Sequence, residues 1–414
     1  MRLGKRTKKF ILILSLMPLM VFYTNCSGGL SDYVESADLP SGNPPTGGSP
    51  TPTVTPTPTV SPSPTVTPTP TVSPSPSPSP TPSNKVTVMV AAGHQARTTL
   101  SCDGGKSWIY DRSDNPNARC WVTGDPNYVE CDHTAVSSQG QSITYGNGYF
   151  YTQFGWGVNG SIRRSADGVN WQVVRTGDWD GGIGTATGIN RVFSMWGSWT
   201  YSNDNGATWL PSAKSFSVYD MAHPLVYLAG SKLLAVGRVD QPLQLAVSSD
   251  GGSSWTTVPS FQSAWGGSFA EGSSGVLVSL GTTVGLVARS TDGGKNWTTL
   301  QAHSRANEPW SSPLLYNGSQ FVAFAGGRKY VSADGLTWTA TTMVNAPASG
   351  PAAYNPVTKT YSVIQNEWDN YYAKQKAWVS TDAVTWTQLS STQFKGGHPL
   401  MRIVIGEVDK SVCP

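Results

Sequence analysis

The sequence predicts an all-β domain in which seven similar units close into a ring. Three observations favour this architecture. A short phrase with Ser, Asp and Trp around a turn, usually containing Gly, occurs seven times. Strand-like runs broken by Gly, Asn and Pro separate its copies, and the last such run has no partner within its own unit. Short strands repeated at a regular spacing are typical of repeat rings, which leave few open sheet edges.

The repeated phrase describes a hairpin turn. Four copies have the spacing Ser-x-Asp-x-Gly-x-x-Trp and three are one residue shorter; the four end at Trp108, Trp209, Trp255 and Trp297, and the three at Trp171, Trp338 and Trp386. The Asp carboxylate can accept hydrogen bonds from the turn backbone, Gly supplies positive φ, and Trp offers a large apolar face to the neighbouring unit. The last copy has Ala383 and Val384 where Gly is usual, so we expect its turn to differ in detail.

This phrase resembles the Asp-box, or BNR repeat, of sialidase-like β-propellers, and the resemblance covers most of residues 85–414. It implies a seven-bladed β-propeller, in which the motif joins the third and fourth strands of each blade on the face away from the ligand site. The resemblance also implies a structural role for the Asp of each copy: Asp103, Asp167, Asp204, Asp250, Asp292, Asp334 and Asp382.

The strands follow in order between the copies. In the sixth unit, the runs at 312–316, 320–324, 328–332 and 338–341 have the spacing of four strands. Second strands of other units are expected at 150–154, 191–196, 232–237, 275–280 and 361–365. The first unit has runs at 86–90 and 98–101 but no inner strand before them, whereas 399–405 is unpaired at the other end. We infer that 399–405 completes the first unit and closes the ring.

The N-terminus has the features of an export signal. Residues 1–26 combine a basic start, with Arg2 and Lys5 among its cations, with an apolar run at 10–22 that is short for a membrane span. Cys26 then precedes Ser-Gly-Gly, as in a bacterial lipoprotein signal, although Tyr-Thr-Asn before it departs from the usual pattern. We expect Cys26 to be lipidated; ordinary cleavage that leaves it free is the alternative.

Residues 27–84 are predicted to be a disordered linker rich in Pro, Thr and Ser. Thr-Pro and Ser-Pro units repeat from Pro50 to Pro82, and such a segment cannot bury a core. The N-terminal lipid is then the expected membrane contact, which places the chain in the bacterial cell envelope, at the outer membrane or cell surface. The domain at 85–414 is expected to be a monomer.

The remaining four cysteines are expected to form two disulfides, because an even number in an exported domain favours a disulfide framework. Three pairings are possible. The strand order places Cys413 near the first hairpin, which contains Cys102, and places both Cys120 and Cys131 in the loop between the first two blades. We therefore expect Cys102–Cys413 and Cys120–Cys131.

The face opposite the Asp-box hairpins is the expected ligand site. Aromatic rings stack on sugar C–H faces while polar groups fix hydroxyls. The Trp residues assigned to ligand binding there are Trp156, Trp179, Trp196, Trp265, Trp310 and Trp368. A glycosidase would need two carboxylates across the scissile bond. The catalytic candidates are Asp178, Asp180, Glu308, Glu367 and Asp369.

No cofactor, metal or nucleic-acid partner is expected. His133, His223 and His398 precede inner strands at matching positions, but no short ligand spacing supports a metal site. The net charge of +3 gives no sign of the basic face that nucleic acids require. The Arg-Ile-Pro motif of true sialidases is absent, and its nearest echo is the run from Met401 to Val404, without Pro.

These observations favour a non-catalytic binding propeller that recognises a glycan or a surface protein through an aromatic-rich face. The alternative is a glycoside hydrolase, either divergent sialidase-like or similar to xyloglucanases. A third hypothesis is an assembly factor. The sequence leaves open whether the chain is an enzyme.

Overall fold

The computed structural model describes residues 84–93, 96–112, 139–155, 161–176, 182–186, 189–195, 199–214, 226–228, 233–239, 244–258, 268–281, 284–369, 372–394 and 399–414. All of them lie in one unit, Ser79–Pro414. The signal at 1–26 with Cys26, the linker up to residue 83, and Cys120–Cys131 fall outside these ranges. Within them, no helix is long and apolar enough to cross a bilayer.

The described residues form an all-β structure of short antiparallel strands, with only two short 3-10 helices, Ser391–Gln393 and Lys410–Val412. The first three sheets of the chain contain β29 (Leu400–Asp409), β1 (Lys85–Gly93), β2 (Thr98–Ser101) and β3 (Ile109–Arg112); β4 (Gln139–Gly146), β5 (Tyr149–Gly155), β6 (Ser161–Ser165) and β7 (Gln172–Thr176); and β8 (Gly182–Ala186), β9 (Arg191–Met195), β10 (Thr200–Ser202) and β11 (Leu210–Pro211).

The fourth sheet has five strands, because β12 adds to its outer edge in parallel to β16. Its strands are β12 (Ala213–Lys214), β13 (Val226–Leu228), β14 (Leu233–Val239), β15 (Gln244–Ser248) and β16 (Ser254–Val258). The last three sheets contain β17 (Phe269–Glu271), β18 (Leu277–Leu280), β19 (Leu286–Ser290) and β20 (Thr298–Gln301); β21 (Leu315–Tyr316), β22 (Phe321–Ala325), β23 (Arg328–Ser332) and β24 (Thr339–Thr342); and β25 (Ala352–Asn355), β26 (Thr360–Asp369), β27 (Tyr372–Ser380) and β28 (Thr387–Gln388).

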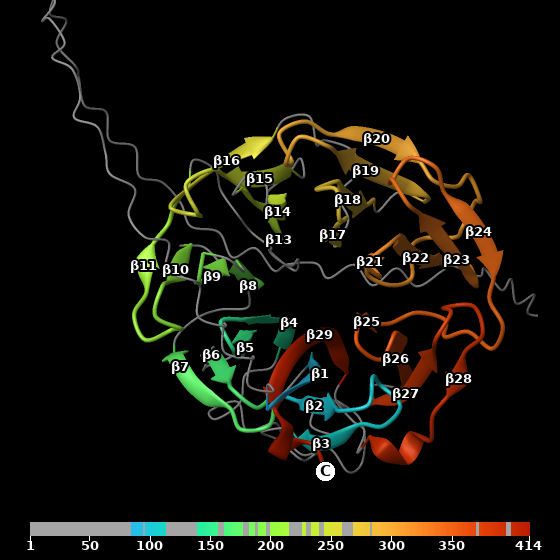
Figure 1. The fold of residues 1–414 in the computed structure, drawn as a ribbon, viewed down its shortest axis with the longest axis horizontal. Coiled ribbons are helices and arrows are strands. Elements are labelled where there is room, and N and C mark those ends of the chain that lie inside the picture. The colour runs from blue at the N-terminus through green and yellow to red at the C-terminus, as the bar shows by residue number, and fades with distance from the viewer. Residues whose placement is uncertain are drawn as a thin grey trace, which may run out of the picture. The chain divides into compact units, whose positions relative to one another are not determined.

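The sheets are arranged around a common centre, each with one strand innermost (Figure 1). The innermost strands are β29, β4, β8, β13, β17, β21 and β25, and each contacts the innermost strands of both neighbouring sheets. The strand from the C-terminus is one of them, because β29 pairs with β1 along its length, from Lys85 opposite Asp409 to Gly93 opposite Leu400. The expected pairing of the last strand with the first unit is therefore confirmed.

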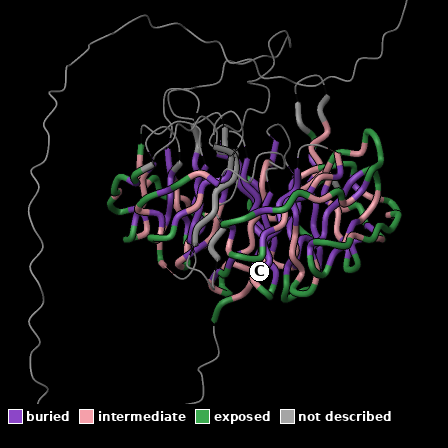
Figure 2. The backbone as a smooth tube through the Cα atoms, turned by 90° about the horizontal axis from the view of Figure 1, so that it is seen from above, coloured by how far each residue is buried: buried purple, intermediate pink, exposed green. Residues whose placement is uncertain are grey.

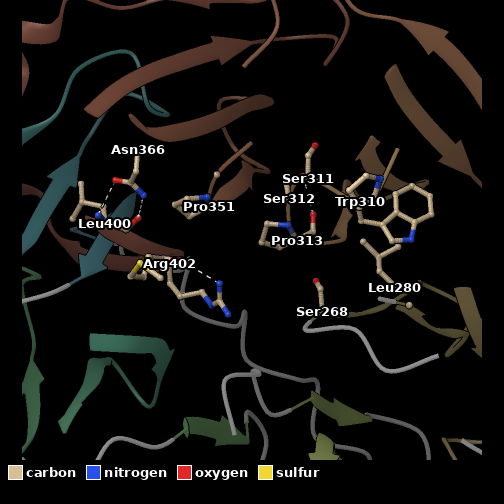
Figure 3. Close-up of a pocket in the computed structure, with 14 residues that line it drawn as sticks. Ser268, Leu280, Trp310, Ser311, Ser312, Pro313, Pro351, Asn366, Leu400 and Arg402 are labelled. Atoms are coloured by element: carbon tan, nitrogen blue, oxygen red, sulfur yellow. Dashed lines mark hydrogen bonds between the residues drawn. The ribbon is translucent and has the colours of Figure 1, made fainter. Parts of the chain in front are cut away.

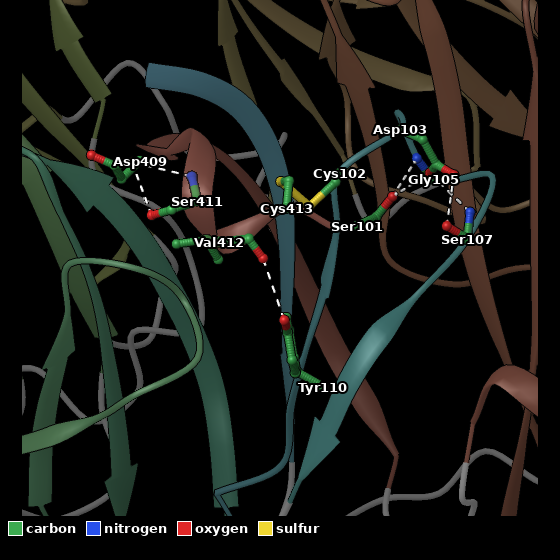
Figure 4. Close-up of a disulfide and its surroundings, with 10 residues drawn as sticks. All are labelled: Ser101, Cys102, Asp103, Gly105, Ser107, Tyr110, Asp409, Ser411, Val412 and Cys413. Carbon is green, nitrogen blue, oxygen red and sulfur yellow. Dashed lines mark hydrogen bonds between the residues drawn. A yellow bond between two sulfur atoms is a disulfide. The ribbon is translucent and has the colours of Figure 1, made fainter. Parts of the chain in front are cut away.

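A disulfide joins the end of β29 to the first repeated turn (Figure 4). Cys102 and Cys413 have Cα atoms 5.8 Å apart and are separated by 311 residues of sequence. This confirms the pairing that strand order predicts, and it fixes the C-terminal end of β29 beside the hairpin between β2 and β3.

The hydrophobic core is divided among the interfaces between neighbouring sheets. In β1, Val88 and Val90 face the second sheet and pack with Phe150, whereas Met89 packs on the other side against Ile364 of the last sheet. This alternation follows from the two-residue period of a strand, and both faces of β1 are buried. Buried positions accordingly lie mainly in the inner strands, whereas exposed positions lie at the turns and in outer strands such as β24 (Figure 2).

The seven repeated turns have the same hydrogen bonds. In each, the Ser hydroxyl donates to the Asp carboxylate two residues later, at 2.7 to 3.1 Å. The same hydroxyl accepts from the backbone N–H of the Gly that follows, or of Ala383 in the last copy. Every turn Asp is thus engaged in its own hairpin.

The last turn corrects one expectation. Ala383 has φ of 58° and its N–H donates to Ser380 at 2.8 Å, as Gly168, with φ of 71°, donates to Ser165 at 2.8 Å. The backbone hydrogen bond of this turn is therefore the same as in the other short copies, with Ala in the place of Gly. A single methyl group tolerates the left-handed region at a cost of about 1 kcal/mol, and here the methyl is fully buried in the core between the last two sheets.

Candidate functional site

The face opposite the repeated turns contains the starts of the innermost strands. In the sheet that β1 forms with β29, the repeated turn follows β2, so the connection from β1 to β2 and the start of β29 lie at the other end. The start of β17 also lies at the end of its sheet away from the repeated turn, because its first residue pairs with Ser279 near the end of β18. Segments that start innermost strands therefore meet on this face.

A cavity of about 500 Å³ lies where the starts of four innermost strands, β17, β21, β25 and β29, converge. Its polar groups include the hydroxyls of Ser268, Ser311 and Ser312, the Asn366 amide and the Arg402 guanidinium (Figure 3). Trp310, Leu280, Pro313 and Pro351 are among its apolar walls. Among the described residues that line it, none carries a carboxylate.

Arg402 also lines a second cavity of about 210 Å³, as do Ser268 and Pro313. The second cavity is lined by residues of β4, β8, β17, β21, β25 and β29, so it lies among the innermost strands. The Arg402 side chain extends from β29 away from Leu400 (Figure 3), and its Nη1 donates to the carbonyl of Met401 at 3.2 Å. Burial lowers the pKa of the guanidinium, which still stays charged at neutral pH.

Asn366 holds the start of β29 in place. Its Nδ2 donates to the Leu400 carbonyl at 2.8 Å, and the Leu400 N–H donates to its Oδ1 at 3.1 Å. The Asn366 side chain thus bonds the backbone of β29 as a neighbouring strand would, and it joins β26 of the last sheet to the first sheet. Because Arg402 is two residues further along β29, these two bonds fix the strand that positions the guanidinium.

Asn366 belongs to a buried polar network that crosses the interface between the last sheet and the first. Gln375 donates to Asn366 at 3.2 Å and accepts from Arg97 at 2.7 Å. Arg97 also donates to both oxygens of Asp111, at 2.8 and 2.7 Å, in a bidentate pair with side chains only 2% and 4% exposed. Bidentate pairs fix orientation as well as charge, so the network makes the cavity wall rigid.

Trp310 lines the cavity and also packs inside an aromatic cluster. Its ring lies edge-on to His303 and Tyr330, with centroids 5.0 and 5.5 Å away, and its indole N–H donates to the Leu286 carbonyl at 3.0 Å. His303 stacks on Tyr330 at 4.6 Å and is 8% exposed. Burial lowers the pKa of His303, although the Glu308 charge opposes the shift, so the neutral imidazole is favoured.

Two of the catalytic candidates have described side chains, and both are engaged. Glu308 accepts from the Tyr330 hydroxyl at 3.5 Å and lies against Gly326. Glu367 pairs with Lys376 at 2.7 Å across β26 and β27 and accepts from Gln365 at 3.3 Å. Neither glutamate lines the 500 Å³ cavity.

The other predicted site residues are not placed. Asp178, Asp180, Trp156, Trp179, Trp196 and Trp265 fall outside the described residues, as do His133, His223 and His398. Trp368 and Asp369 are described only as backbone, in β26. Within the described ranges, no group of three or more His, Cys, Asp or Glu side chains could hold a metal ion.

Sequence reasoning did not assign the residues that make the cavity polar. Arg402 stood out only as part of an incomplete motif, and Asn366 and Ser268 carried no signal. A hydroxyl or an amide just before or within a strand is common in any β domain, so only the arrangement of the strand starts reveals this set.

Comparisons with known proteins agree with this architecture. Residues 269–350 match a family described as the DUF6242 beta propeller domain. A protein from Lactobacillus plantarum is 12% identical over 78% of this chain and 99% of its own, with a TM-score of 0.50. That likeness concerns the fold alone.

Two further structures are similar at lower TM-scores. YCF48 bound to D1 peptide is 16% identical over 68% of this chain and 89% of its own, with a TM-score of 0.47. The GH74 xyloglucanase from Xanthomonas campestris is 13% identical over 72% of this chain, with a TM-score of 0.46, and this chain spans about half (54%) of its length. No curated protein matches. The described residues thus form an all-β structure of four- and five-stranded sheets, and residues 269–350 match a β-propeller family.

Proposed function

We propose that this chain is a non-catalytic binding protein of the cell envelope with a seven-bladed propeller. It binds an acceptor-rich ligand, a glycan or a segment of a surface protein, in the 500 Å³ cavity, which we call the Arg402 cavity. The observation that carries the proposal is the composition of the cavity wall. It has serine hydroxyls, an amide and a guanidinium, and no carboxylate among its described residues. Guanidinium groups only donate hydrogen bonds, so the cavity suits ligands with many acceptor oxygens.

The proposed propeller has seven blades, and β29 closes the ring by completing the first of them. The pairing of β29 with β1, the contacts between neighbouring innermost strands and the Cys102–Cys413 disulfide support this closure. Closure matters for function because Leu400, Met401 and Arg402 reach the cavity only when β29 is in place.

The envelope location is proposed from the N-terminal sequence. The basic start, the apolar run and Cys26 support a lipid anchor, and the Pro-rich segment supports a spacer between anchor and domain. One acyl-bearing cysteine would tether the chain without a membrane-spanning segment. Metabolic labelling with a radioactive fatty acid tests this point, since labelling is expected in the wild type and lost in Cys26→Ala.

The binding proposal is tested with a panel of oligosaccharides and peptides titrated against the exported chain by calorimetry. Arg402→Gln should weaken binding by about tenfold or more, because a charge-assisted hydrogen bond contributes about 1.5–3 kcal/mol. Arg305→Gln is the matched control, since Arg305 is exposed and does not line the cavity. Ser268→Ala provides a second, smaller change in the same wall.

Unchanged affinity in both Arg402→Gln and Ser268→Ala, with the fold intact by thermal unfolding, would place the ligand elsewhere. Release of reducing sugar during the titration would favour the hydrolase instead. In that case, one carboxylate-to-amide change among the candidates should abolish the release.

A further inference from the structure

A separate concave surface lies at the outer rim, between the sheet of β21–β24 and the sheet of β25–β28. It has a volume of about 450 Å³ and is lined by Asn345, Ala346, Trp378, Trp386, Thr387 and Gln388. None of these residues lines the Arg402 cavity. We call this surface the rim groove.

The aromatic floor of the rim groove follows from strand register. Trp378 of β27 lies directly opposite Gln388 of β28, so the two side chains are on the same face of the sheet. Trp386, which is 2% exposed, packs with Phe324, with ring centroids 5.7 Å apart, and anchors this end of the sheet. Trp378 is only partly buried and packs against the same core cluster. The indole of Trp378 therefore packs on the core cluster that contains Trp386 and borders the groove.

Polar groups surround this indole. Asn345, Thr387 and Gln388 are exposed, and among the described residues neither amide side chain has a hydrogen-bond partner. Asn345 has φ of 52°, a conformation that Asn adopts more readily than most residues. An amide offers both a donor and an acceptor, which matches a pair of adjacent sugar hydroxyls, and a Trp ring suits the C–H face of a pyranose.

Two observations favour a neutral saccharide over a charged ligand or a peptide strand. All six lining residues are uncharged. In addition, the backbone beside the groove is already paired. The Val344 N–H donates to the Val384 carbonyl at 2.8 Å, and the Trp386 N–H donates to the Val344 carbonyl at 3.1 Å. An incoming peptide therefore finds that stretch of backbone occupied, so strand addition is disfavoured there.

We infer that the rim groove is a binding subsite for a neutral saccharide unit, separate from the Arg402 cavity. The indole of Trp378 stacks on the sugar, and the amides of Asn345 and Gln388 fix its hydroxyls. The inference does not require the proposed function of the Arg402 cavity, although two subsites on one domain would let it hold a long glycan at two points.

The test titrates the full chain by calorimetry with neutral oligosaccharides of gluco, xylo, galacto and manno configuration. Asn345→Ala and Gln388→Ala remove exposed side chains and leave the core intact, and each should weaken binding about fivefold to tenfold. Trp378→Ala should abolish binding, and Trp378→Phe should retain part of it because the ring face remains.

Val357→Ala is the control, since Val357 is 69% exposed in the turn between β25 and β26 and does not line the groove. Binding that Arg402→Gln weakens but Asn345→Ala and Gln388→Ala do not would overturn the inference and leave the proposed function standing. The reverse pattern would support the rim groove and overturn the proposed cavity. Failure of every neutral oligosaccharide to bind, or binding of peptides alone, also overturns the inference.

Discussion

The carboxylate of Asp204 accepts three hydrogen bonds in its turn. Two come from the hydroxyl and the backbone N–H of Thr208, at 2.6 and 2.8 Å, and one from the Ser202 hydroxyl at 2.7 Å. Because these donors favour the charged form, they lower the pKa of Asp204 to about 2. In other turns, such as those of Asp167 and Asp292, burial opposes the shift, but the hydrogen bonds outweigh it and the pKa is also lowered.

The lowered pKa values predict how stability depends on pH. A carboxyl whose folded pKa lies below its unfolded value of about 3.9 stabilises the fold above that pH and stops doing so as the pH falls through the folded pKa. We expect the free energy of unfolding to fall between about pH 4 and pH 2. Asp204→Asn should be less stable at pH 7 and should show a shallower fall over this range, measured by urea unfolding at several pH values. An unchanged slope would contradict the role of this carboxylate.

The left-handed position of each turn predicts an asymmetry between two substitutions. At Gly168, a Cβ would lie 2.8 Å from Val90 and 3.0 Å from Leu100, so Gly168→Ala should lower the free energy of unfolding by about 2 kcal/mol. Ala383→Gly relieves strain but removes a buried methyl, two effects of about 1 kcal/mol each, so it should be nearly neutral. Equal costs for the two substitutions, measured by denaturant unfolding, would contradict the packing and strain assigned to these two positions.

At the scale of elements, β29 is held at both of its ends. Asn366 hydrogen-bonds Leu400 at the cavity, and the disulfide binds Cys413 beside the first repeated turn. Gln375 hydrogen-bonds both Asn366 and Arg97, and Arg97 pairs with Asp111. These contacts join β26 and β27 to the first sheet. The strand that supplies Arg402 is therefore positioned by neighbours on two sheets.

Two ion pairs of equal length predict different costs. Asp111→Asn removes the negative charge opposite a buried arginine and replaces one acceptor oxygen with an NH2 donor, and should lower the free energy of unfolding by about 3 kcal/mol. Glu367→Gln breaks a pair whose side chains are 37% and 35% exposed, and should cost less than about 1 kcal/mol. Denaturant unfolding of both variants is the measurement. A cost at Glu367 that equals or exceeds the cost at Asp111 would contradict the role given to the buried network.

At the scale of the whole molecule, the disulfide joins the two ends of the described domain. It spans 311 residues, and closing so long a loop constrains the unfolded chain strongly. The double variant Cys102→Ser with Cys413→Ser should therefore lower the free energy of unfolding by about 4 kcal/mol. It should still fold, because β29 keeps its ladder with β1. Unchanged stability in thermal and urea unfolding would contradict a closing role for the bridge.

The sequence revealed the parts of this molecule that are local in the chain. Each repeated turn lies within eight residues, so its spacing alone predicts the hairpin, and the unpaired run near residue 400 predicts the strand that pairs with β1. The network could not be foreseen, because Arg97 meets Gln375 from 278 residues away. The cavity is hidden for the same reason, since Ser268, Asn366 and Arg402 come from three sheets.

The proposed function as a whole depends on whether a ligand of the Arg402 cavity is bound and released unchanged. The most direct measurement is mass spectrometry of an oligosaccharide that binds the purified chain, recovered after prolonged incubation. We expect all of the ligand to return at its original mass, and Arg402→Gln to retain much less of it during capture. Recovery of shorter products, lost when Glu308 or Glu367 is changed to Gln, would contradict the account and identify a glycoside hydrolase.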